Sequence, residues 1–185
     1  MRIVHHHDPV QSFVVCAIGE PGAREFFLQI ESGQGQTTIS IEKEQAIGLV
    51  NKLEELLREL RRRKIYPKSV QNLSLANISP DYPIDENFRA GLMGITWLSD
   101  EERIAIEIQE LSTDPLIQDL LPIGDEISGE YAPEIARAIL SIEQAKLFTV
   151  RTMEIVNSGR QPCPFCGLPI NPAGHLCPRA NGYKR

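Results

Sequence analysis

The sequence has no long apolar run and few cysteines. No stretch of its 185 residues approaches the ~20 consecutive apolar residues that a membrane-spanning helix needs. The first ten residues are polar and rich in histidine, unlike a secretory signal, so we expect a cytoplasmic protein with no membrane partner. Three of the four cysteines lie within fifteen residues. This clustering disfavours a secreted disulfide framework and is typical of a metal site in a reducing compartment.

Concentrated positive charge is also lacking, although the charge is unevenly divided. The formal net charge is −6, with ten basic and nine acidic side chains in residues 1–78. Residues 79–143 carry three basic against fifteen acidic side chains, and residues 144–185 carry six against one. Because phosphate binding requires concentrated positive charge, this acidic middle makes nucleic acid an unlikely partner, and binding through the basic tail ranks third among our hypotheses.

No spacing in the sequence specifies a reaction. Cys16 lies in a predicted strand without a recognisable base, so we interpret it as an apolar core residue rather than a nucleophile. The turn at 19–22 lacks the length and the lysine of a phosphate-binding loop. The basic run at 61–64 suits a solvated helix end. The histidines at 5–7 are interpreted as a mobile surface run, and the sequence leaves open whether they bind metal.

What the chain does contain is a repeated order of elements. Apolar alternation predicts strands, and apolar residues at helical spacing predict two amphipathic helices. The expected elements are strands at 12–18, 25–31 and 37–42 with a helix at 43–63, then strands at 88–97, 103–111 and 135–140 with a helix from 141 to about 157. Residues 113–131 are interpreted as an acidic loop insertion whose role the sequence does not indicate.

The two halves also match around the helix starts, where residues 41–46 align with residues 140–145. We therefore expect an α+β fold of two pseudo-symmetric βββα units, about 12–63 and 88–159, related by a pseudo-twofold. These units would form a six-stranded sheet system with two helices and a core spanning residues 1–159. A chance recurrence of short elements is the alternative.

The tail, residues 160–185, carries a metal-binding pattern. Cys163 and Cys166 are followed after eight residues by His175 and Cys177, which suits the tetrahedral demand of Zn²⁺. Gly167 would aim backbone amides at the thiolates, as in a zinc-knuckle hairpin. Four protein ligands leave no open position, so we predict structural zinc, with a redox dithiol, catalytic zinc or another metal as alternatives. The apolar side chains expected to cover the hairpin are Leu168, Ile170 and Leu176.

With these motifs in view, the chain resembles a known family. The tail at 163–170 and 174–183 carries the resemblance most specifically, and the turn at 19–22, residues 26–29 and the strand from Phe88 add to it. The family is an uncharacterised bacterial one, domain of unknown function 3090. The resemblance covers essentially the whole chain except the acidic insertion, and it implies no activity because the family has none assigned.

These observations favour a non-enzymatic binding or adaptor protein with a zinc-stabilised docking tail. Arg179, Asn181 and Tyr183 follow the last ligand, and such residue types anchor interfaces, so we predict that they bind a partner. That partner would be another protein or a second copy of the chain. The alternative is an enzyme or ligand-binding accessory protein with a site between the halves near residues 19–22. Substrate, partner identity and oligomeric state are not determined by the sequence.

Overall fold

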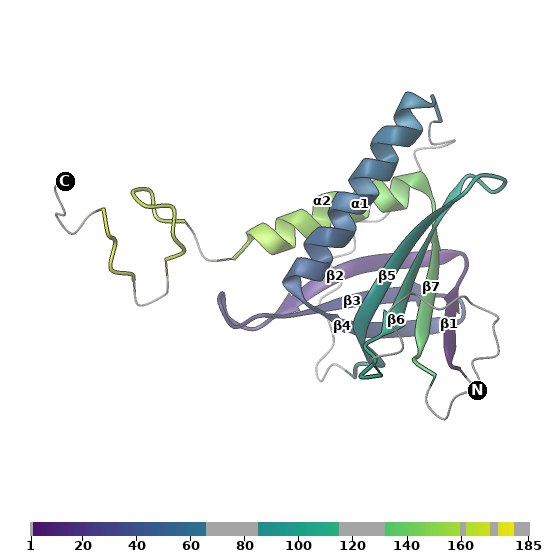
Figure 1. Ribbon diagram of the computed structural model, residues 1–185, viewed down its shortest axis with the longest axis horizontal. Helices are drawn as coiled ribbons and strands as arrows, with labels where there is room; N and C mark the ends of the chain where they lie inside the picture. The colour runs from purple at the N-terminus through teal and green to yellow at the C-terminus, as the bar shows by residue number, and fades with distance from the viewer. Residues whose placement is uncertain (1, 66–84, 115–131, 160–161, 171–173, 180–185) are drawn as a thin grey trace.

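The computed structural model describes residues 2–65, 85–114, 132–159, 162–170 and 174–179 (Figure 1). A short first strand precedes two successive runs of three strands and a helix. The elements are β1 Val4–His7, β2 Val10–Ile18, β3 Glu25–Ser32, β4 Gly35–Ile41, α1 Lys43–Arg62, β5 Phe88–Leu98, β6 Arg103–Glu110, β7 Ile135–Leu140 and α2 Ile142–Asn157. The predicted order and nearly all boundaries are confirmed to within two residues. The acidic insertion lies almost wholly outside the described residues.

The strands form one mixed sheet in the order β1-β7-β6-β5-β4-β3-β2. The β4–β5 and β1–β7 pairs are parallel, and the other neighbouring pairs are antiparallel. The sheet therefore has seven strands, and the six expected from the sequence were one too few. The missing strand is β1, which pairs through Val4 to His7 with residues 135–138 of β7.

The histidine run at 5–7 belongs to this strand, so its interpretation as a mobile surface run was wrong. His5 Nε2 lies 2.8 Å from a carboxylate oxygen of Glu134. His7 is only 3% exposed, with Nδ1 2.9 Å from the Ser32 hydroxyl and Nε2 2.8 Å from the Thr37 hydroxyl. Burial lowers the pKa of His7, and the neighbouring His5 and His6 lower it further. Tertiary partners, rather than apolar alternation, hold this strand.

The sheet curls so that its two outer strands come together. β1 and β2 lie at opposite ends of the strand order but are separated in the chain by only Asp8 and Pro9. The His7 side chain links β1 to the ends of β3 and β4. Figure 1 shows β2, β3 and β4 running across the direction of β5, β6 and β7. The curl turns one face of the sheet inward.

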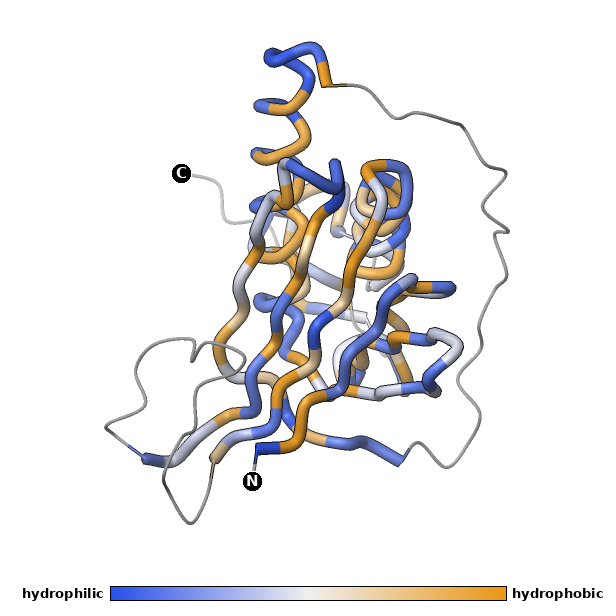
Figure 2. The backbone as a smooth tube through the Cα atoms, turned by 90° about the vertical axis from the view of Figure 1, so that its right-hand side faces the viewer, coloured by the Kyte–Doolittle hydropathy of each residue, from blue (hydrophilic) through white to orange (hydrophobic). Residues whose placement is uncertain are grey.

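The hydrophobic core fills this inner face and is covered by both helices. Apolar and polar residues alternate along the strands, which places one set inside (Figure 2). Phe13 of β2 and Phe148 of α2 lie with ring centroids 4.7 Å apart. The inward residues of β3, β6 and the helices include Leu28, Ile30, Ile104, Ile106, Ile108, Ala46, Leu49, Val50, Leu53 and Ala145. No helix in the described part of the chain is long and apolar enough to cross a membrane.

Both helices begin in the same way. The backbone N–H of Ser141 donates to the Gln144 side chain, and Gln144 N–H donates to Ser141 Oγ, as the predicted capping box requires. The N–H of Glu42 donates likewise to Gln45. The same glutamines also contact strands distant in the sequence: Gln45 Nε2 donates to the Ala90 carbonyl of β5 at 3.1 Å, and Gln144 Nε2 donates to the Val10 carbonyl of β2 at 2.8 Å.

Candidate metal centre

The tail begins as a tight hairpin. Pro162 and Pro169 form an isolated antiparallel bridge, and inside it the N–H of Cys163 donates to the Leu168 carbonyl at 2.8 Å. The N–H of Gly167 returns to the Cys163 carbonyl, also at 2.8 Å. Gly167 has a φ of +75°, the left-handed conformation that glycine adopts readily. This turn carries two of the four predicted ligands, Cys163 and Cys166.

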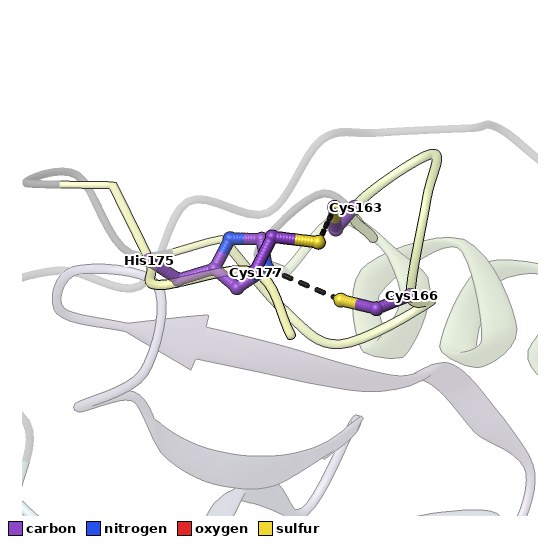
Figure 3. A group of neighbouring side chains, drawn as sticks. All are labelled: Cys163, Cys166, His175 and Cys177. Carbon is purple, nitrogen blue, oxygen red and sulfur yellow. Dashed lines mark hydrogen bonds between the residues drawn. The ribbon is translucent and has the colours of Figure 1, made fainter. Parts of the chain in front are cut away.

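The four predicted ligands converge, and Figure 3 shows their side chains pointing toward one another. Their donor atoms all lie within 4.8 Å of one another. Cys163 Sγ is 3.7 Å from Cys177 Sγ, and Cys166 Sγ is 3.2 Å from His175 Nε2. A tetrahedral ion with Zn–S bonds of about 2.3 Å would separate two sulfurs by about 3.8 Å, close to the first distance. The cluster could therefore bind a metal ion.

The electrostatics of the cluster favour a cation. Burial raises the pKa of the Cys163 thiol, but hydrogen bonds from the backbone of Cys166 and Phe165, and from neighbouring thiols, bring it below its usual value. The pKa of Cys166 is raised by burial and by the neighbouring Cys163 and Cys177, despite a backbone hydrogen bond at Leu168. A bound divalent cation would offset the repulsion between neighbouring thiolates, because it stabilises the deprotonated form of all three cysteines together.

The hairpin does not fold over its own apolar side chains. Cys163 and Cys177 are buried, whereas Phe165 is 63% exposed, Leu168 52% and Leu176 86%. The expectation that Leu168 and Leu176 cover the hairpin is therefore wrong. The described hairpin is too short to enclose a core, so two of its ligands are buried and two are half-buried, while its large apolar side chains face outward.

Of the three residues predicted to bind a partner, the structure describes Arg179. Its guanidinium donates from Nη1 to the Phe165 carbonyl at 3.1 Å, and the side chain is exposed. The end of the described tail is thus tied back to the turn that carries two of the ligands. Asn181 and Tyr183 lie outside the described residues.

Two other candidates have the plain roles expected from the sequence. Cys16 is buried, its thiol donates to the Phe27 carbonyl at 3.6 Å, and burial raises its pKa to about 11, which disfavours a nucleophile. The basic residues at 61–64 are exposed at the end of α1, where Arg63 pairs with Glu59 at 2.8 Å. Within the described ranges, the Cys3His group is the one cluster of three or more candidate metal ligands.

The hairpin also forms one wall of a cavity of about 970 Å³. Pro162 and Pro169 line it together with Gly22 from the β2–β3 turn, Ser40 near the end of β4 and Arg89 of β5. The sequence predicted, as an alternative, a site between the halves near residues 19–22. These lining residues could not be identified from the sequence, because they come from five separate segments and share no motif.

Comparisons with known proteins place the chain in a family but do not assign it an activity. No curated protein and no solved structure gave a significant match. A family model described as "Protein of unknown function (DUF3090)" matches residues 5–177, nearly the whole chain and including all four candidate ligands. The tail motif and the core therefore occur together within one family model. On this evidence the chain belongs to the DUF3090 family.

Proposed function

We propose that Cys163, Cys166, His175 and Cys177 hold one structural zinc ion in a zinc-knuckle hairpin. The donor set of three thiolates and one imidazole suits zinc. The left-handed Gly167 and the sulfur–sulfur distance of 3.7 Å support this assignment. Four protein ligands fill a tetrahedral shell, so such an ion would organise the tail without activating water or substrate.

We further propose that the zinc-held tail is a docking element and that the protein is a non-enzymatic adaptor. The observation that carries this proposal is the exposure of Phe165, Leu168 and Leu176 on one short metal-held segment. Phe165 lies between two ligands, and Leu176 lies between the other two, so metal binding fixes the backbone from which both side chains project. Exposed apolar side chains held rigidly in this way are typical of interaction surfaces.

The charge of this part of the chain indicates the kind of partner. Residues 155–185 carry four basic side chains and no acidic one. Arg179 lies beside the apolar group and is exposed. The partner we propose is therefore a protein with an apolar groove edged by carboxylates. A second copy of this chain would supply carboxylates from its acidic middle, so self-association is an outcome that the test must distinguish.

A paired substitution tests the docking role. Phe165→Ser with Leu176→Ser should weaken the purified partner complex at least tenfold and leave the zinc content unchanged, because neither residue is a ligand. Val150→Ser, which removes an exposed apolar side chain from α2, is the matched control. The partner would be captured from the native host, identified by mass spectrometry and titrated as purified protein. Sedimentation of the wild-type chain alone would reveal a homomeric complex. Equal affinity of both variants would contradict the role.

We also propose that the core is an internal repeat. In this interpretation β1 and β2 together correspond to the single long strand β5. The start of β5 pairs in parallel with β4, as β1 does with β7, and the rest of β5 pairs with β6 as β2 does with β3. Irregular registers occur near Val10 and near Ala90, which are also the carbonyls reached by the two capping glutamines. The buried Ile41 and Leu140 occupy matching positions before the helices.

A further inference from the structure

We propose that the cavity beside the metal hairpin binds a short peptide that carries both a positive and a negative charge. This role goes beyond the docking function of the tail, because the cavity lies between the core and the base of the hairpin rather than on the exposed apolar side chains. The two halves of the core differ at the positions that match this cavity, and the charged side chains that line it indicate the ligand.

At the junction where the end of β1 meets β6 and β7, the position that matches the cavity is filled by an ion pair. Arg103 of β6 donates to both carboxylate oxygens of Asp8, at 2.5 and 3.2 Å, and also pairs with Glu101. Asp8 directly follows β1 where β1 runs along β7. The nearby residue of β7 is the apolar and buried Ile139. Opposite charges and a bulky side chain therefore close this junction.

In the first half, the matching positions do not close the junction. By the sheet registers, Glu25 occupies the position equivalent to Arg103, and Arg89 occupies the position equivalent to Asp8. Arg89 pairs instead with Glu42 at the start of α1, and in the described part of the chain Glu25 has no ion-pair partner. Ser40 stands where the second half has Ile139. The smaller side chain and the exchanged pairing leave the cavity open.

The charges that line the cavity indicate the ligand. Three cations and three carboxylates contribute to the lining: Arg24, Lys43, Arg89, Glu25, Glu42 and Glu86. A simple anion would meet the carboxylates, and a simple cation would meet the basic groups, so a molecule with both charges is matched best. Phe27 and the prolines of the hairpin add apolar contact. A volume of about 970 Å³ is large for one amino acid and suits a short peptide.

Exchanging the Arg89–Glu42 ion pair for a contact with a ligand should cost little free energy. The Arg89–Glu42 pair is more than half exposed on both side chains, so a ligand carboxylate can replace Glu42 without a large penalty. Arg24 is held by Ser158, whose hydroxyl and carbonyl accept from the guanidinium at 3.1 and 3.0 Å. That contact joins the β2–β3 turn to the end of α2 and keeps one wall of the cavity in place.

The test is a titration of the isotopically labelled full-length protein with the tripeptide lysyl-alanyl-glutamate, followed by amide NMR shifts. Saturable shifts are expected at Gly22 and Arg89, with at least tenfold weaker binding of glycine and of acetyl-trialanine amide. Ser40→Ile, which copies the closed half, and Arg89→Gln should each weaken tripeptide binding at least tenfold. Lys52→Gln, on the exposed face of α1, should leave it unchanged.

Several results would overturn the proposal. The first is the absence of saturable shifts with tripeptide at concentrations up to about 5 mM, a range that detects even weak binding. The second is equal affinity of the Ser40→Ile variant and the wild type, with dispersed NMR spectra confirming that both are folded. The third is equal binding of the uncharged peptide, since the lining charges would then play no part.

Discussion

The contact of His7 with Ser32 and Thr37 gives a direct test of what holds β1 against β3 and β4. Replacing His7 with leucine removes both hydrogen bonds and leaves two buried hydroxyls with one partner fewer. An unsatisfied buried polar group costs about 1–3 kcal/mol, so we expect the free energy of unfolding to fall by about 2–4 kcal/mol. Urea denaturation can be followed by the fluorescence of Trp97, the single tryptophan, which packs against the core.

A triple variant separates the hydrogen bonds from simple packing. His7→Leu combined with Ser32→Ala and Thr37→Val leaves no hydroxyl without a partner at this junction, so at least about 1 kcal/mol of the loss should return. His6→Leu, on the same strand but exposed, is the control and should change stability by no more than about 0.5 kcal/mol. If the triple variant is no more stable than His7→Leu alone, hydrogen bonding does not explain how β1 is held against β3 and β4.

Three further predictions follow from the same structure. Because the folded protein holds the pKa of His7 below 6.5, the unfolded chain binds the proton first. Stability should therefore be full above pH 6.5 and fall at lower pH, by at most about 1.4 kcal/mol per pH unit, and His7→Leu should flatten this part of a denaturation series. Gly91→Ala should lower the free energy of unfolding by about 1–3 kcal/mol, because a Cβ there would lie 2.8 Å from the Leu111 Cα. Gly48→Ala should raise it by about 0.5–1 kcal/mol, because a Cβ at this position of α1 meets open space. Equal thermal shifts for the two glycine variants would refute this contrast. Cys166→Ser should abolish metal binding yet change the free energy of unfolding of the core by less than about 0.5 kcal/mol, because none of the described tail residues belongs to the core cluster. Loss of the whole circular dichroism signal would contradict this prediction.

The sequence was informative where local pattern determines structure. β7 was predicted at 135–140 and is observed with those bounds, because its apolar residues end directly at Ser141, the N-cap of α2. The capping box at Ser141 and Gln144 was also confirmed. The converging ligands of the tail were predictable for the same reason: their spacing and Gly167 act within one short segment.

The features that the sequence did not predict depend on distant contacts. β1 has three consecutive histidines and no apolar alternation, and its burial comes from residues far along the chain. Leu168 and Leu176 were assigned inward by their apolar character, but the short hairpin has no core to receive them. The lining of the cavity depends on which charged side chains of the two halves pair with each other. The sheet register determines these pairings, and it cannot be read from the sequence.

X-ray absorption of the purified full-length protein at the zinc edge tests the metal assignment most directly. With about one zinc per chain by elemental analysis, we expect three sulfur neighbours at about 2.3 Å and one nitrogen neighbour at about 2.0–2.1 Å. The spectrum should show no water ligand, because Cys163, Cys166, His175 and Cys177 fill the coordination shell. A shell containing oxygen, or clearly less than half an equivalent of zinc with all thiols reduced, would contradict the assignment of a structural zinc site.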